Sequence, residues 1–378
     1  MWMKSVDCCP LSVDIKIKIM KKILSFLICV FLSFNVFSQE EKFTPYQINF
    51  GFPLSTTNIK EAKEFTNAFS INMLVGISKN EKSLALAGIS NIISNNATGL
   101  QVAGLSNHIG NKGYGAAVAG LINTTKDSYC GLYVSGICNY SAMGTGLQIA
   151  GISNITKDIN IGVQISGVIN YAKDIKGVQI AGVTNIANDV KGLQFAGVMN
   201  KAKKVKGVQF ASLLNIAEES NFPIALVNII KNGKMGIALS YDIMNNAMLS
   251  FRSGGKYTYG ILGVGYNNLV NDGSKLVAEA GYGIHIPIND MLEINNEFKA
   301  TSVGFSNNKT CFNASYLLAP SFTFAEHYNI FGGVSFNYLY SNYVNSNDLI
   351  PSRCLWSKDG NYNQRMFIGY QIGVQYVF

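Results

Sequence analysis

A short phrase recurs between residues 84 and 232. Intact copies read GLQVAGLSN (from Gly99), GLQIAGISN and GVQIAGVTN, and most copies follow one another at 15 or 16 residues, with a last step of 13. Each copy ends on an asparagine. These asparagines are Asn91, Asn107, Asn123, Asn139, Asn154, Asn170, Asn185, Asn200, Asn215 and Asn228. A fixed period this short is typical of stacked repeats, in which one unit is too small to bury its own apolar residues.

One unit, residues 177–191, shows what each copy must accommodate. Val178 and Ile180 alternate with Gln179, which is typical of a strand with one apolar face. Asn188-Asp189 has the composition of a turn. We expect stacked units to share a continuous core containing about five apolar positions per unit. These positions are Val178, Ile180, Val183, Ile186 and Val190.

Two all-β arrangements fit this period. In a parallel β-solenoid each unit is one coil, and equivalent amides stack about 4.8 Å apart, where they satisfy one another's hydrogen bonds. In the alternative, each unit is one strand of an antiparallel meander or membrane barrel. Similarity between every pair of neighbouring units favours the solenoid. We therefore expect a structural role, rather than ligand binding, for the repeated asparagines from Asn107 to Asn215 and for Gln148, Gln164, Gln179, Gln194 and Gln209.

The beginning of the chain has the pattern of a secretory signal peptide. Met20-Lys21-Lys22 is followed by an apolar run from Ile23 to Phe34 and a cleavage-compatible Val36-Phe37-Ser38. Residues before Met20 read as an over-extended start. Without residues 1–38, which hold five lysines and two aspartates, the chain has 25 basic and 20 acidic side chains. This mild excess is spread over turns, so we expect no nucleic-acid partner.

Residues 39–83 connect this segment to the repeats. The stretches Tyr46–Phe52 and Ser70–Ile77 alternate in polarity and are predicted strands. We interpret 39–83 as an N-terminal cap that covers the first repeat, because an open solenoid end exposes core and unpaired strand edges.

Four cysteines lie beyond residue 38: Cys130, Cys138, Cys311 and Cys354. Their spacings contain no CxxC or Cys/His pattern typical of metal sites. We expect small apolar fillers rather than disulfides, and the sequence predicts no metal, cofactor or catalytic residue.

Residues 233–378 have a different pattern, of long alternations rich in tyrosine and phenylalanine. In the last run, from Met366 to Phe378, an apolar face opposes a small and polar one over thirteen residues. That length can cross an outer membrane as a tilted strand. We count eight such strands, with links after the second, fourth and sixth shorter than those after the others. This predicts an outer-membrane-type antiparallel β-barrel.

An eight-stranded barrel has an interior filled by side chains. By alternation, Glu279, His285, Glu293, Glu297 and Lys299 face that interior. We interpret them as a polar lumen network. The alternative is a paired-carboxylate site formed by Glu293 and Glu297, but no nucleophile or cleft accompanies them.

Several phrases resemble a known family. PLSTTN at Pro53–Asn58, LVGISKN at Leu74–Asn80, RSGGKYTYGILGVGYN at Arg252–Asn267 and the GLQIAGISN units are similar to exported repeat proteins common in Bacteroidetes, which have relatives among leptospiral surface-repeat lipoproteins. The resemblance implies a cell-envelope protein with no assigned activity and supplies no functional residues. Unlike the lipoproteins, this chain has Ile28 before Cys29, a poor lipobox.

Taken together, the patterns predict a non-enzymatic envelope protein, exported to the outer membrane or cell surface, with a structural or adhesive role and outer-membrane lipid as a partner. The alternative is a secreted or surface module that recognises a polysaccharide or host protein through the repeat face. A polysaccharide-binding face would require a stripe of aromatic or charged residues, whereas tyrosines are only scattered through the repeats.

Overall fold

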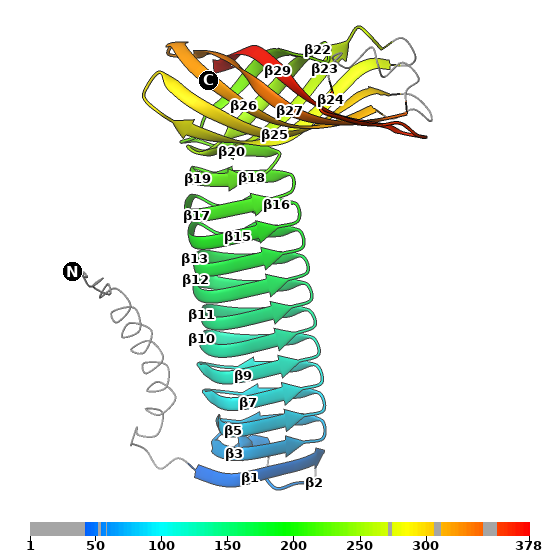
Figure 1. The fold of residues 1–378 in the computed structure, drawn as a ribbon. Helices are drawn as coiled ribbons and strands as arrows, with labels where there is room; N and C mark the ends of the chain where they lie inside the picture. Colours follow the sequence, from blue (N-terminus) through cyan, green and yellow to red (C-terminus); the bar gives the residue numbers. More distant parts are fainter. Residues whose placement is uncertain (1–41, 52–53, 58, 271–273, 306–310, 343–353) are drawn as a thin grey trace, which may run out of the picture. The chain divides into compact units, whose positions relative to one another are not determined.

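A computed structural model describes residues 42–51, 54–57, 59–270, 274–305, 311–342 and 354–378. The predicted signal peptide, within 1–38, lies outside the described residues. Residues 43–378 form one compact unit that is nearly all β-strand (Figure 1). Within the described ranges, the helical segment is the four-residue α2 (Ile59–Ala62), and no helix is long and apolar enough to span a bilayer.

The stack of coils begins inside the predicted cap. Strands β3 (Phe65–Asn72) and β4 (Val75–Ser78) pair in parallel with β5 (Asn80–Ala87) and β6 (Ser90–Ile93), as later coils do. Outside this first coil, β1 (Lys42–Gly51) pairs with β3 and, antiparallel, with β2 (Leu54–Ser55). The strand edge of the first coil is therefore covered by β1.

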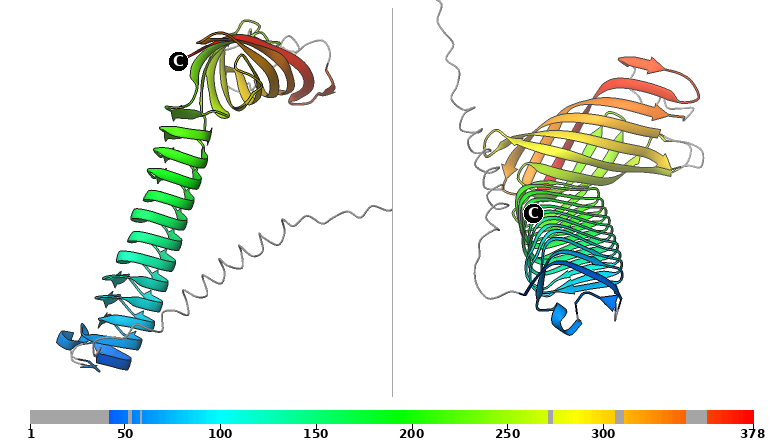
Figure 2. Two further views of the ribbon diagram at one scale, coloured as in Figure 1. Left: turned by 90° about the vertical axis from the view of Figure 1, so that its left-hand side faces the viewer. Right: turned by 90° about the horizontal axis from the view of Figure 1, so that it is seen from below.

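The repeats form a parallel β-solenoid, as predicted, and the antiparallel alternative is wrong. Each coil pairs in register with the next, so that Asn154 lies opposite Asn170 and Gln164 opposite Gln179. Figure 2 shows the coils superposed when viewed from below. The remaining coil strands are β7 (Ala97–Ala103), β8 (Ser106–Ile109), β9 (Gly113–Ala119), β10 (Ile122–Ser135), β11 (Cys138–Ala150), β12 (Ser153–Ser166), β13 (Ile169–Ala181), β14 (Thr184–Ile186), β15 (Asp189–Ala196), β16 (Met199–Lys201), β17 (Lys204–Ala211), β18 (Leu214–Ala217), β19 (Glu219–Ile224) and β20 (Val227–Ile230).

The interior of the coils differs from the predicted core. Of the five apolar positions expected inside the unit 177–191, only Val190 is buried; the other four side chains point outward. Gln179, Ala181, Asn185 and Ala187 occupy the interior instead. The prediction is wrong because a buried amide that hydrogen-bonds to the equivalent amide in the next coil pays little desolvation free energy. Alanine side chains are also small enough for the narrow interior of the coil.

Because the glutamines lie inside the coils and their apolar neighbours outside, the strands that carry the repeated glutamine have an apolar outer surface. The two residues flanking that position point outward in every coil. We call this surface the aliphatic face; from β3 to β19 it consists of Phe69, Ile71, Leu84, Leu86, Leu100, Val102, Ala116, Val118, Leu132, Val134, Leu147, Ile149, Val163, Ile165, Val178, Ile180, Leu193, Phe195, Val208, Phe210, Phe222 and Ile224.

In eight coils a glycine lies at the corner that directly precedes the aliphatic face. These glycines, from Gly99 to Gly207, have positive φ, and Gly177 has φ 144°. A Cβ on Gly177 would lie 2.0 Å from the carbonyl oxygen of Gly162 in the coil before it. Only glycine therefore fits this corner, because both the conformation and the approach of the next backbone exclude a side chain.

The C-terminal region is a closed antiparallel barrel, as predicted. Each strand pairs with the next, and β21 pairs with the last long strand to close the ring. The short β28 (Trp356–Lys358) adds to its outer end. The eight barrel strands are β21 (Met235–Asp242), β22 (Asn246–Gly254), β23 (Thr258–Asn267), β24 (Ser274–Pro287), β25 (Leu292–Phe305), β26 (Cys311–Ala325), β27 (Tyr328–Ser341) and β29 (Asn363–Val377).

One predicted link length is wrong. The link from β21 to β22 contains three residues, no more than the link from β22 to β23, although a longer one was expected. Asp242 accepts hydrogen bonds from the backbone N–H groups of Met244 (2.9 Å) and Asn246 (3.0 Å), and Asn245 has φ 61°. An aspartate that bonds to the backbone two residues ahead stabilises a tight turn, which is why this link is short.

Candidate functional site: the barrel wall, its lumen and the amide ladders

The outer wall of the barrel is an apolar belt. Alternate residues of the barrel strands point outward, and on every strand the outward set includes large apolar side chains that are more than a third exposed. On β29, the outward positions from Gln364 to Tyr376 carry no charge, and Ile372 is 55% exposed. Other members of the belt are Leu239, Leu249, Leu262, Val264, Leu276, Ile284, Phe298, Leu318, Phe322, Ile330, Val334, Phe336, Ile368 and Val374. An apolar surface that surrounds a molecule marks contact with protein or lipid.

Aromatic residues gather at the two ends of this belt. At the end with the short turns, the Tyr328 and Tyr376 rings lie 5.2 Å apart, and Phe378 packs edge-on against Tyr376. At the opposite end, the rings of Tyr340 and Tyr362 stack at 4.6 Å. Aromatic girdles on both sides of an aliphatic band are typical of membrane barrels, because tyrosine places an apolar ring and a polar tip at the lipid–water boundary.

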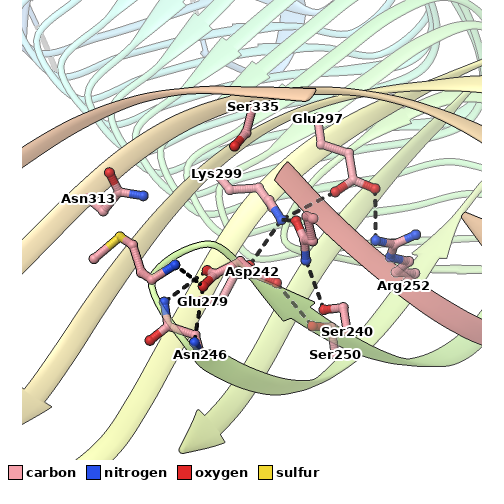
Figure 3. A network of polar contacts seen from close by, with 12 residues as sticks. Ser240, Asp242, Asn246, Ser250, Arg252, Glu279, Glu297, Lys299, Asn313 and Ser335 are labelled. Atoms are coloured by element: carbon pink, nitrogen blue, oxygen red, sulfur yellow. Dashed lines mark hydrogen bonds and ion pairs between the residues drawn. The ribbon is translucent and has the colours of Figure 1, made fainter. Parts of the chain in front are cut away.

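The lumen holds a charged network (Figure 3). The Arg252 guanidinium contacts Glu297 at 2.9 Å, and Lys299 lies 3.2 Å from Glu279 and 3.5 Å from Glu297. The Tyr259 hydroxyl donates to Glu297 at 2.8 Å. All five side chains are buried. Buried charges are tolerated only when they are paired, and here two cations face two carboxylates.

A second cluster lies nearer the short turns. The Glu293 carboxylate contacts Lys234 at 2.7 Å and His285 at 3.4 Å, and His285 also bonds to Asn295 at 2.8 Å. Glu293 and Glu297 therefore each have their own cationic partner, and the structure does not bring them together as an isolated pair. The five residues predicted to face the lumen are all buried there.

Apolar side chains also lie in the interior, beside the charged and other polar ones. Phe331 and Leu317 pack together in one cluster, and Phe367 and Leu339 belong to another. Lys299 additionally donates to Gln371, so side chains from β25 and β29 meet across the lumen. The interior is thus filled by side chains, as expected for eight strands.

The described residues show neither a metal-binding cluster nor a disulfide. They contain no group of three histidine, cysteine, aspartate or glutamate side chains able to hold a metal ion. None of the four described cysteines beyond residue 38 forms a disulfide; Cys311 is buried and Cys354 is exposed.

The predicted repeat asparagines form one continuous ladder inside the solenoid. Each side-chain N–H donates to the Oδ1 of the asparagine in the next coil, at 2.9–3.0 Å, from Asn91 through to Asn228. The same amide nitrogen also donates to a strand carbonyl; for Asn154 this is Ile165 at 2.7 Å. The ladder therefore satisfies buried amides and backbone carbonyls together.

The glutamines form a second, shorter ladder. Gln164, Gln179, Gln194 and Gln209 each donate to the Oε1 of the preceding glutamine at 2.8–2.9 Å, starting from Gln148. Tyr133 occupies the equivalent place before Gln148, and Pro223 follows Gln209. The five glutamine side chains, from Gln148 to Gln209, are all buried and form a continuous chain of hydrogen bonds.

The last coil contacts the outer side of the barrel wall. The backbone N–H of Asn228 donates to Ser253 Oγ at 2.9 Å, and its side chain donates to the Ser253 carbonyl at 3.1 Å. The Thr258 hydroxyl donates to the Pro223 carbonyl at 2.7 Å. At Gly260 an added Cβ would lie 2.1 Å from the Ala225 carbonyl oxygen. The final rung of the asparagine ladder is thereby bonded to β22.

Three lumen residues of the network, Arg252, Tyr259 and Lys234, were not predicted from the sequence. Ser250 and Arg252 nevertheless alternate with Leu249 and Phe251. This alternation with a period of two could have indicated that Ser250 and Arg252 face the lumen. The pairing of Arg252 with Glu297 joins residues on β22 and β25, which are not adjacent strands, so the alternation alone could not predict it.

No protein-family model matches the chain, and no curated protein does. Among solved structures, the chain is similar to one described as "De novo design of transmembrane beta-barrels", with 16% identity and a TM-score of 0.23, covering 38% of this chain and 93% of that chain. A TM-score this low leaves the functional argument to the chain's own residues.

Proposed function

We propose that this chain is a non-enzymatic protein of the bacterial cell envelope, anchored by its barrel in the outer membrane, with a structural or adhesive role for the solenoid. The observation that carries the proposal is the apolar belt around a closed barrel with a charged lumen. This arrangement, apolar outside and polar inside, is the reverse of a water-soluble barrel.

The energetics of the belt support the membrane anchor. Leaving one large aliphatic or aromatic side chain in water instead of burying it forgoes about 1.5–3 kcal/mol. The belt includes such residues on all eight strands, among them Val264, Phe322 and Val334. A bilayer would cover these side chains without requiring a shaped partner.

The sequence supports the location. The predicted signal peptide would export the chain, and the phrases shared with exported repeat proteins fit the cell envelope. The filled lumen favours an anchor over a channel, and the separate ion pairs of Glu293 and Glu297 favour a structural role over catalysis. The two outward positions that flank the interior glutamine position are apolar in every coil, which supports protein contact over polysaccharide recognition.

Vesicle insertion tests the anchor. The full chain without residues 1–38 is refolded from urea with and without preformed phospholipid vesicles, floated on a density gradient and washed at alkaline pH. We expect the chain to float, to resist the wash and to migrate faster on a gel when unheated, as folded barrels do. Recovery of a folded, soluble chain that leaves the vesicles unbound would contradict the proposal.

A further inference from the structure

The aliphatic face of the solenoid has no covering element among the described residues. Its side chains keep partial exposure: Leu193 is 38% exposed and Phe195 46%. Such partial exposure is expected for side chains that contact the equivalent side chains of the coils before and after but have no described residue covering their outer side. Every position of the face is apolar, over eleven successive strands (β3, β5, β7, β9, β10, β11, β12, β13, β15, β17 and β19).

Charges lie around the corner from this face. Lys176, Lys191 and Lys206 are exposed, and each directly precedes the corner glycine of its coil. Asp189 and Lys204 are exposed on the same side, and Lys204 forms an ion pair with Glu219 at 2.8 Å. Along these three coils the surface therefore has a boundary between charged and apolar positions, whereas uncharged residues such as Ile161 occupy the corresponding position in the earlier coils.

The size of the face decides what kind of contact it can make. Eleven strands spaced about 4.8 Å apart give a length of about 50 Å, and four strand residues give a width of about 13 Å. The flat area is then about 650 Å² per molecule, slightly above the roughly 300–600 Å² of the largest apolar patch on a typical soluble monomer. Two such faces would together bury about 1,300 Å², which lies within the range of specific protein interfaces.

We propose that the aliphatic face is the contact surface between two copies of this chain. The face is a flat sheet with a constant spacing between rows, so an identical face has the same period of ridges and grooves. Two such sheets can pack about 10 Å apart with interdigitated side chains. A contact of one patch with itself closes as a two-fold dimer.

Two features of the face make this partner fit better than lipid. The face is longer than the roughly 30 Å hydrocarbon core of a bilayer, and the charged side chains of Lys176, Lys191 and Lys206 lie beside three of its strands. Near one end, the Phe195 and Phe210 rings stack at 4.8 Å. Aromatic side chains in the plane of an apolar patch are typical anchors of protein interfaces.

Cross-linking tests the contact. In the full chain, with the four cysteines beyond residue 38 replaced by alanine, Ile149→Cys places a thiol at the middle strand of the face. Lys157→Cys places one at an exposed position of β12 outside the face. We expect a short thiol cross-linker to give dimers with Ile149→Cys and not with Lys157→Cys. Equal cross-linking of the two variants, or none with Ile149→Cys, would overturn the proposal.

Sedimentation measures the strength of the contact. In detergent at about 10 μM protein, above the Kd of most specific interfaces of this size, the unmodified chain should be dimeric. Ile165→Glu, an outward substitution in the middle of the face, should raise the dimer Kd at least about a hundredfold, while Lys157→Glu should not. A monomeric unmodified chain would refute the dimer, and so would an unchanged Kd for Ile165→Glu when hydrogen exchange shows intact coils.

Lipid is the competing occupant. In vesicles containing nitroxide-labelled lipid, a fluorophore on Ile149→Cys should remain unquenched if the second copy covers it. Quenching as strong as that of a fluorophore on Ile372→Cys in the barrel belt would assign the face to lipid and exclude the dimer.

Discussion

Asn154 shows how a single polar residue stabilises the solenoid interior. Its side-chain nitrogen donates to Asn170 and to the Ile165 carbonyl, and its oxygen accepts from Asn139 at 2.9 Å. Each asparagine thus bonds to the coil before and the coil after. Because the amide is fully buried, removing one rung leaves partners on both sides unsatisfied, and each unsatisfied group costs about 1–3 kcal/mol.

We expect Asn154→Ala to destabilise the coils next to it by about 2–4 kcal/mol, since at least two buried partners lose their bond. Hydrogen–deuterium exchange of the full chain, followed by mass spectrometry, should show faster exchange in peptides covering residues 139–170. Ser153→Ala, the outward-facing neighbour, serves as the control and should leave exchange unchanged. Equal exchange in the two variants would mean that the ladder contributes nothing to stability.

Glu81 should make the first coils sensitive to pH. Burial raises the pKa of this carboxyl above its ordinary value near 4.5, although Ser70 and Asn67 donate hydrogen bonds to it at 2.7 and 3.0 Å. The folded state therefore binds the proton more tightly than the unfolded state. Stability should rise as the pH falls through the raised pKa, and it should level off below the ordinary one.

This pH dependence can be measured as exchange in peptides from residues 65–87 at pH 7 and pH 5, corrected for the intrinsic rates. Glu81→Gln keeps the buried acceptor without the charge, so we expect more protection at pH 7 and a smaller difference between the two pH values. Glu61→Gln, at an exposed site, is the control. A pH difference that persists undiminished in Glu81→Gln would show that another group is responsible.

At the scale of one element, the corner glycine determines whether a coil can stack. Gly177 combines a positive φ with a backbone carbonyl at the place of its missing Cβ. We expect Gly177→Ala to cost about 1–3 kcal/mol from backbone strain alone, plus the displacement of the neighbouring coil. Lys176→Ala, one residue earlier, should be nearly neutral. The check is exchange in residues 162–192, and similar protection in both variants would contradict the role of the corner.

The elements also show how far sequence reasoning could reach. The repeat period predicts stacking, and alternation predicts which barrel residues face the lumen, from Glu279 to Lys299. Alternation cannot determine which side of the Val178-Gln179-Ile180 strand faces inward, because that depends on ladders between coils. Assuming that apolar residues lie inside gave the reverse of the observed solenoid core. The tight turn after Asp242 was not predicted either, because it depends on hydrogen bonds between the Asp242 side chain and the backbone, which alternation does not show.

At the scale of the molecule, the solenoid and barrel are joined by small residues. Ser253 and Gly260 are paired on neighbouring strands and both contact the last coil. We expect Gly260→Leu to displace this coil, because its side chain would overlap the carbonyls of Ala225 and Leu226. Exchange in residues 219–230 should then increase while the barrel stays folded.

Val264→Leu is the matched control for this junction. It lies on the same strand and the same side, but is 63% exposed. Unchanged exchange in residues 219–230 for Gly260→Leu would show that the two regions are not held together at this point.

The proposed membrane anchor makes a prediction that distinguishes lipid from water around the belt. Ile372→Arg places a charge at a belt position that is 55% exposed. In water this change would be nearly neutral, whereas in the middle of a bilayer it should cost about 2–4 kcal/mol. Urea unfolding of the barrel in vesicles measures the difference, with the exposed Ser357→Arg as the control. Equal stability of the two variants would count against a bilayer around the belt.

The central claim, that lipid surrounds the barrel, is tested most directly by spin labels along β29 in vesicles. Single cysteines at positions 368 to 374, in a chain otherwise free of cysteine, are labelled and probed with oxygen and a water-soluble nickel complex. We expect Ile368, Tyr370, Ile372 and Val374 to be open to oxygen and closed to nickel, alternating with low accessibility to both at Gly369, Gln371 and Gly373. Nickel access at the four outward positions would show that water, not lipid, covers the belt.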